Sequence, residues 1–271
     1  MARLAPCIPV LALIATSPAL AGPYTEPGHE ISEMVAWATE VEAIARGPLD
    51  AANPAGGNAS HGAPELALGP AGGVDTLDSV SLGDGGSITL WFESGIADGS
   101  GHDFAVFENS FYNLEGLFAE LAFVEVSSNG TDFARFAAVT LVADPIWSFG
   151  SLDPTDVHNL AGKHPIDEGT GFDLADLEQH PLVSGDLLDL ADVRYVRIVD
   201  VIGNGSTFDS QDPPAEVFDP YPTAFAAGGF DVQAVGVLHA VPEPDAVAGL
   251  AAGIGWLCVL SRRRSARRRA S

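Results

Sequence analysis

The chain has 271 residues, of which 46% are hydrophobic and 18% charged, the composition of a folded globular protein. This excludes a coiled coil, a collagen and a wholly disordered chain. With 37 aspartates and glutamates against 12 lysines and arginines, the formal net charge is -25. Because nucleic acids are polyanions, we expect no nucleic-acid partner.

The basic residues lie mainly at the two ends of the chain. Arg3 stands near the start, and six arginines stand near the end: Arg262, Arg263, Arg264, Arg267, Arg268 and Arg269. All the acids except Glu243 and Asp245 lie in residues 22–240. The sequence is therefore an anionic body between two basic, apolar ends.

Residues 1–21 have the plan of a secretory signal peptide. Arg3 precedes a largely apolar run over 4–15, and Ala19 and Ala21 form a small-x-small cleavage site after which we expect cleavage. The alternative is a first buried helix of the domain. We leave this segment out of the fold prediction.

At the other end, residues 246–260 form an uncharged apolar run that the arginine cluster over 262–269 follows almost directly. A membrane-spanning helix needs roughly 20 residues, so this run is short, although arginines that reach the interface add length. The positive-inside bias places the arginines in the cytoplasm. We therefore expect the body to be exported and, at least briefly, anchored in the inner membrane.

The motif Val241-Pro242-Glu243-Pro244 stands just before this run. Together with the apolar run and the arginine-rich end, residues 241–271 resemble the PEP-CTERM sorting tail. The resemblance implies that an exosortase-type membrane enzyme recognises and removes the tail, in Gram-negative bacteria that make extracellular polysaccharide. A permanent single-pass anchor is the alternative, and both place the body outside the inner membrane.

The body contains no cysteine, because Cys7 lies in the signal segment and Cys258 in the apolar run. Disulfides and thiolate metal sites are therefore excluded for residues 22–240. Its stability must come from its core, alone or together with a bound metal.

Residues 22–74 read as an N-terminal extension. Apolar residues at helical spacing predict a helix over 30–45, and a region rich in Gly, Pro and Asn follows it. The region 144–192 reads as a long ordered excursion at one end of the domain.

From residue 75 on, short apolar segments alternate with Gly, Asn and Asp, a pattern typical of a sandwich. Strands are predicted at 87–92, 104–107, 122–126, 133–136, 193–199 and 230–238. The pair Asn129-Gly130 predicts a hairpin. The predicted fold is all-β, a jelly-roll-like β-sandwich over 75–240, flanked by the signal peptide and a transmembrane helix.

Several of these segments also resemble a family of bacterial cell-surface proteins that often carry this tail. The matching pieces are residues 82–90, 103–109, 123–133, 161–163 with 172–177, 195–200 and 228–236. The resemblance implies a jelly roll related to galactose-binding-like domains, without a settled activity. Gln233 departs from the family pattern, which usually has a second aspartate there.

Acidic residues cluster in loops beside strand ends, and hard carboxylate oxygens suit calcium. The best predicted ligands abut apolar strands: Asp103, Glu108, Asp200 and Asp231. The alternative is that these carboxylates cap turns, with Arg194 or Arg197 as partners. The stretch from Asp98 is no EF-hand, because Asp103 stands where that loop needs glycine.

Motifs of the common enzyme classes do not occur. The seven histidines show no zinc-hydrolase spacing, and neither a nucleophile elbow nor a phosphate-binding loop is present. A glycosidase needs only two carboxylates that meet in space, so this class stays a distant third hypothesis. We do not expect an enzyme.

Carbohydrate sites use aromatic platforms beside polar loops, and Trp147 and Tyr221 are the aromatic residues that best meet this description. The sequence thus predicts an exported cell-surface or extracellular-matrix protein with a structural or adhesive role, calcium as cofactor, and extracellular polysaccharide as a partner. A lectin-like glycan-binding module is the alternative.

Overall fold

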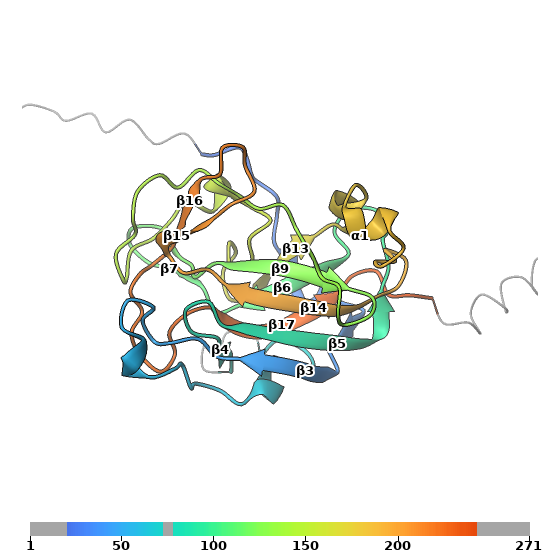
Figure 1. Ribbon diagram of the computed structural model, residues 1–271, viewed down its shortest axis with the longest axis horizontal. Coiled ribbons are helices and arrows are strands. Elements are labelled where there is room, and N and C mark those ends of the chain that lie inside the picture. Colours follow the sequence, from blue (N-terminus) through green and yellow to red (C-terminus); the bar gives the residue numbers. More distant parts are fainter. Residues whose placement is uncertain (1–20, 73–77, 243–271) are drawn as a thin grey trace, which may run out of the picture.

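In the computed structural model, which describes residues 21–72 and 78–242, two antiparallel sheets form a β-sandwich (Figure 1). One sheet has the strand order β1 (His29–Glu30), β13 (Glu168–Phe172), β6 (Phe104–Glu108), β17 (Asp231–Val237) and β2 (Ala36–Trp37), with β4 (Val80–Ser81) also paired to β17. The other has the order β10 (Ala134–Arg135), β9 (Ala122–Ser127), β14 (Val193–Asp200), β5 (Ser87–Ile96) and β3 (Glu40–Ala45). The all-β sandwich prediction is confirmed, whereas its jelly-roll topology stays a prediction.

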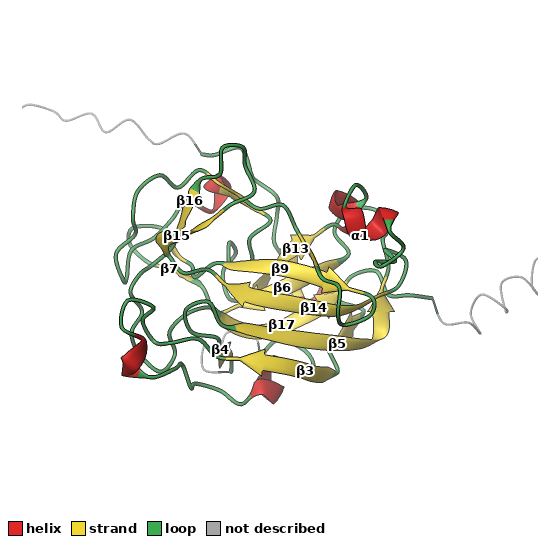
Figure 2. Ribbon diagram, in the orientation of Figure 1, coloured by secondary structure: helices red, strands yellow, loops and turns green. Residues whose placement is uncertain are grey.

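Short elements surround the sandwich, most of them at its two ends (Figure 2). Three two-stranded ribbons are formed by β7 (Phe111–Tyr112) with β8 (Leu117–Phe118), β11 (Val139–Thr140) with β12 (Val157–His158), and β15 (Asn204–Phe208) with β16 (Glu216–Phe218). The helix α1 spans Pro181–Ser184, and 3-10 turns span Ile31–Glu33, Pro54–Gly56, Pro64–Ala67, Pro154–Asp156 and Leu174–Leu177. The labels β7, β15 and β16 lie at one end of the strands and α1 at the other.

The core lies between the sheets, where strand alternation turns apolar side chains inward. In β14, Val193, Val196 and Ile198 are buried while the residues between them are partly exposed. The main cluster of the core contains residues of both sheets. It includes the rings of Phe104, Phe136 and Phe172, whose centroids lie 5.1–5.9 Å apart. A second buried cluster, which includes Leu117, Leu121, Phe123, Leu152, Val157, Leu160 and Val217, lies under the loops at the end with β7.

The predicted helix over 30–45 is wrong. This segment forms one 3-10 turn and the strands β2 and β3. The register of β3 against β5 shifts between Val41 and Ala43, so Val41 and Ile44 both pack against the core although they are three residues apart. A bulge in an edge strand thus produced the spacing of a helix face.

The predicted boundary at residue 75 does not separate two structural units either. β1 and β2 extend one sheet and β3 extends the other, so residues 22–74 belong to the sandwich. Likewise β13, inside the predicted excursion over 144–192, is an interior strand between β1 and β6. These short strands were missed because pairing with a neighbouring strand, rather than local pattern, stabilises them.

The predicted strands from 87 onward and the hairpin are present. β9 and β10 pair in antiparallel register, and the side-chain oxygen of Asn129 accepts hydrogen bonds from the amides of Thr131 and Asp132 at 2.9 Å. Within the described part of the chain, no helix is long and apolar enough to cross a membrane. The predicted signal segment up to residue 20 and the predicted span 246–260 lie outside the described residues.

Candidate functional site

The four predicted calcium ligands do not meet at one place. β6 runs from Phe104 to Glu108, so Asp103 and Glu108 lie at its opposite ends. Asp200 ends β14 and Asp231 begins β17, whose residue Val232 pairs with Glu108. Glu108, Asp200 and Asp231 therefore share the end of the sandwich that carries β7, and Asp103 lies at the other (Figure 1).

Asp103 is fully buried, and its carboxylate holds two chain segments together by accepting hydrogen bonds from their amides, a role that we call a backbone clamp. Its carboxylate accepts hydrogen bonds from the amides of Gly99 and Leu174 at 2.7 Å and pairs with His239 Nδ1 at 2.8 Å. Oxygens of Asp98, Asp103 and Asp173 lie within 4.8 Å of one another, and among the described residues this is the one such triple of potential metal ligands. Because its central carboxylate already has three partners, the turn-capping alternative explains Asp103 best.

Six buried carboxyl groups gather at the other end, which we call the acidic end: Asp84, Glu108, Glu120, Asp200, Asp219 and Asp231. Burial, and mutual repulsion for most of them, raises the pKa of Glu108, Glu120, Asp200 and Asp219 well above ordinary values. Burial also raises the pKa of Asp231 to about 6. Each negative charge here is therefore costly unless it is paired.

The aspartates of the acidic end are held by hydrogen-bond donors. Asp200 accepts from the amides of Phe230 at 2.6 Å and Gly85 at 2.8 Å, one for each oxygen. The remaining aspartates accept from Leu121 N (Asp219, 2.8 Å), Ala51 N (Asp84, 2.6 Å), and Ser81 Oγ and Asn109 Nδ2 (Asp231, the latter at 2.8 Å). Asp200 thus acts as a clamp like Asp103, rather than as a free ligand.

The two glutamates differ from the aspartates in one respect. Glu108 is 2% and Glu120 4% exposed, and the Oε1 atom of each is buried without a hydrogen-bond partner. The carboxyl group of Glu108 accepts from the amide of Ser110 at 2.6 Å, through Oε2, and is also hydrogen-bonded by the Ser110 side chain and the Asn109 backbone. These two buried Oε1 oxygens therefore lack the donors that hold the aspartates of the acidic end.

Sequence reasoning missed Glu120, although a signal was present. It is a single acid inside the apolar run 117–124, where a buried charge is otherwise rare. The position of Glu120 is set by a close approach of two backbone segments, in which Ala122 pairs with Ala161. Next to this pair, Gly162 has a φ of 96°. A Cβ atom on Gly162 would lie only 2.0 Å from the carbonyl oxygen of Glu120. Only glycine fits there.

Positive charge is sparse beside the acidic end. Arg46 lies near Asp231, but its guanidinium donates to the carbonyls of His61 at 2.8 Å and of Ser81 and Gly62 at 2.5 Å. The arginines expected to pair with the calcium ligands lie elsewhere. Arg197 binds Glu125, and Arg194 binds Asp192 at 2.5 Å.

The acidic end opens into a cavity of about 330 Å³. Its polar lining consists of Glu120, Asp231, Asn109 and His61. Its apolar lining consists of Ala227 and four phenylalanines, which we call the phenylalanine rim: Phe111, Phe118, Phe149 and Phe225. The rings of Phe111 and Phe118 stack at 5.1 Å, and those of Phe149 and Phe225 lie parallel within 7° at 6.4 Å. Apolar walls over a few polar groups are typical of ligand sites.

Of the two aromatic residues predicted to bind a ligand, only Trp147 adjoins this rim. It is 59% exposed and meets Phe149 edge to face at 6.0 Å. Tyr221 is not in the cavity lining; its hydroxyl donates to Asp50 at 2.5 Å and accepts from Ala52 N at 3.2 Å. Tyr221 therefore secures the 50–52 turn.

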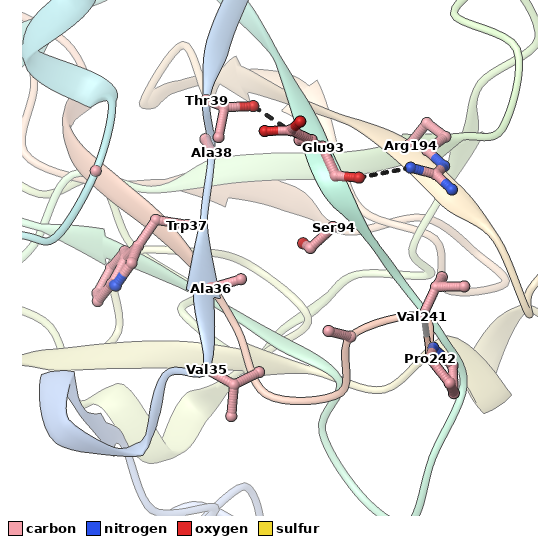
Figure 3. Close-up of a pocket in the computed structure, with 12 residues that line it drawn as sticks. Val35, Ala36, Trp37, Ala38, Thr39, Glu93, Ser94, Arg194, Val241 and Pro242 are labelled. Atoms are coloured by element: carbon pink, nitrogen blue, oxygen red, sulfur yellow. Dashed lines mark hydrogen bonds between the residues drawn. The ribbon is translucent and has the colours of Figure 1, made fainter. Parts of the chain in front are cut away.

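A larger groove of about 710 Å³ lies where the chain leaves the sandwich (Figure 3). Val241 and Pro242 of the predicted sorting motif line it together with Val35 and Ala36, and Arg194 donates to the carbonyl of Glu93 at 2.8 Å. The bridge between Ile96 and Ala240 attaches the chain up to this point. Glu243 and Pro244 of the motif lie outside the described residues.

Two histidines 73 residues apart also meet. His29 Nε2 lies 2.8 Å from His102 Nδ1, and His29 Nδ1 lies 2.8 Å from Glu33. Among the described residues, no third potential metal ligand comes within 4.8 Å of both rings' nitrogens. A hydrogen bond between a donor and an acceptor nitrogen accounts for the contact.

Comparison with protein-family models and with curated proteins finds no significant match to this chain. The function proposed below therefore depends on the geometry of the acidic end, its cavity and the charge pattern of the sequence.

Proposed function

We propose that the chain is an exported cell-surface or extracellular-matrix protein with a structural or adhesive role, and not an enzyme. The tail over 241–271 would be recognised by an exosortase-type processing enzyme and would anchor the chain in the inner membrane until the tail is removed. The observation that carries the proposal is the phenylalanine rim, whose members Phe111, Phe149 and Phe225 are exposed above buried acids at a loop-rich end of the sandwich. Exposed aromatic clusters on a rigid scaffold are contact surfaces.

Two further features support export. The body has no cysteine to oxidise and carries nearly all of the acidic residues, which keep an exported protein soluble and repel anionic lipid. Its buried acids hold backbone amides, a structural use of carboxylates. We propose calcium as the cofactor and extracellular polysaccharide as the partner.

The mass of the protein recovered outside the cell tests this proposal. In a bacterium that has an exosortase-type enzyme, we expect a chain that starts at Gly22 and lacks the tail. The double variant Pro242→Ala/Glu243→Ala should keep the tail and stay with the membrane. Recovery of the intact 28.0 kDa chain from the cytosol would contradict export.

Glycan binding is the second candidate, because Trp147 continues the rim beyond Phe149. We expect the purified protein to bind extracellular polysaccharide, and Phe149→Ala to weaken binding about tenfold, since truncating one aromatic anchor costs about 1.4 kcal/mol. Trp147→Ala should act similarly. The matched control is Val35→Ala, another exposed apolar residue, which lines the other groove.

The variant Tyr221→Phe tests whether Tyr221 contacts a glycan, as the sequence predicts, or only stabilises the turn at residues 50–52. Binding should be unchanged, because the Tyr221 hydroxyl is used inside the protein. If the purified protein binds no glycan, with or without calcium, the glycan-binding candidate is excluded and the structural role remains.

A further inference from the structure

Two cavities adjoin at the end of the sandwich that carries β7. One is the cavity of about 330 Å³ with the phenylalanine rim, and the second, of about 390 Å³, is lined mainly by residues 141–147 and 150–153. Trp147 lines the second cavity, and its ring meets that of Phe149, in the rim of the first, at 6.0 Å. Both side chains are exposed, so an exposed aromatic pair lies between two neighbouring cavities.

Hydrogen bonds attach the loop that carries this aromatic pair to the ribbon of β7 and β8. Asn113, in the turn of the ribbon, accepts from Ser151 Oγ at 2.9 Å, and Leu152 N donates to the carbonyl of Leu117 at 3.0 Å. The walls of the two cavities are therefore fixed to one another before any ligand binds. A surface formed in advance loses less conformational freedom on binding.

The charges that line both cavities are negative. Glu120 and Asp231 line the first cavity, and Glu115, Asp144 and Asp153 line the second. Among the described residues that line these cavities, none is a lysine or an arginine. The body of the chain is itself strongly anionic. Such a surface repels anionic polymers and attracts cationic ones.

Glu120 is an acid of this lining that lacks an internal partner. It is 4% exposed, and its Oε1 atom has no hydrogen-bond partner within the described part of the chain. Asp231, in the same lining, repels it. Because an unsatisfied buried acceptor is destabilising, a ligand that brings a positively charged donor to this wall of the cavity gains affinity there.

We propose that this surface binds a glycan with free amino groups, whose sugar rings pack on Trp147 and Phe149 and whose ammonium groups lie beside the carboxylates of the two cavities. Ammonium groups are attracted both to carboxylates and to the faces of aromatic rings. The volumes of both cavities are within the range of about 300–1,000 Å³ that is typical of ligand pockets. The inference rests on the proposed polysaccharide partner and adds its chemical class.

The test compares two oligosaccharides of equal length, a glucosamine hexamer and its N-acetylated form, by calorimetry with the purified full chain at low salt and at a pH that keeps the sugar amines protonated. We expect the glucosamine hexamer to bind about tenfold more tightly, as the combined effect of several charge contacts, and its affinity to fall as salt is added. Equal affinities would overturn the inference and leave glycan binding intact. Failure of both oligosaccharides to bind would overturn the inference and the glycan partner together.

Hexalysine tests whether sugar rings are needed. It carries the same kind of positive charge on a flexible chain without rings, so we expect it to bind more weakly than the glucosamine hexamer. Tighter binding of hexalysine would assign the surface to a cationic peptide and refute the proposal.

Charge-removing variants locate the amino groups. Glu115→Gln, Asp144→Asn and Glu120→Gln should each weaken binding of the glucosamine hexamer about two- to fivefold and leave that of the N-acetylated hexamer unchanged. The matched control is Asp98→Asn, which removes an exposed acid near Asp103, at the opposite end of the sandwich. Circular dichroism checks that the variants fold. An equal loss of affinity in Asp98→Asn would assign the effect to net charge and refute the assignment to this surface.

Discussion

Replacing Asp103 by asparagine is expected to lower the free energy of unfolding by about 2–4 kcal/mol. The carboxylate accepts from the amides of Gly99 and Leu174 and pairs with His239. An asparagine has one acceptor oxygen, and its NH2 group faces donors on the other side. At least one buried donor is therefore left unsatisfied, and each such group costs about 1–3 kcal/mol.

Urea unfolding followed by tryptophan fluorescence measures this loss. Asp98→Asn is the matched control, since Asp98 belongs to the same acidic triple but is exposed. Its effect should stay within about 0.5 kcal/mol. Equal effects of the two substitutions would show that Asp103 contributes through the charge of the triple and not as a clamp.

In the presence of a chelator, the stability of the protein is expected to fall as the pH rises, because of the acidic end. Burial raises the pKa of Glu120 well above its ordinary value of 4.5, with Asp231, Glu108, Asp219 and Asp200 adding repulsion. A carboxyl whose pKa is higher in the folded state binds its proton more tightly there. Its contribution is therefore complete below pH 4.5 and is lost progressively as the pH rises to the folded pKa.

The variant Glu120→Gln isolates this contribution. Relative to wild type, the variant should gain about 1.4 kcal/mol of stability for each pH unit between pH 4.5 and the folded pKa of Glu120. His164, whose pKa burial lowers to about 4, destabilises both proteins equally as the pH falls below 6.5, so its effect cancels in the difference. Denaturant unfolding at pH 5, 6, 7 and 8 gives the comparison, and a constant difference would contradict the expected titration.

Much of the strand set follows from local pattern. The hairpin of β9 and β10 is encoded by Asn129-Gly130 between apolar alternations, and β14 by its regular inward residues. β1, β2, β3 and β13 have no such pattern. They exist because a neighbouring strand offers its backbone groups, and for β3 the bulge between Val41 and Ala43 even produced the spacing of a helix.

The candidate site could be predicted only in part. Glu108, Asp200 and Asp231 were recognised as acids at strand ends, and they do share one end of the sandwich. Whether such an acid is a clamp or a free acceptor depends on donors remote in sequence. Asp200, for example, binds the amide of Gly85, 115 residues away.

The sequence alone determined the separation of charge between body and ends, the absence of cysteine from the body and the all-β class, because composition, alternation and turn residues are local properties. The tertiary structure decided which carboxylates are satisfied and which are not. The pairing of β6 with β17 brings Glu108 next to Val232, and the passage of Gly162 beside Glu120 fixes the second glutamate. Contacts over such separations arise only when the sheets assemble, and no local pattern records them.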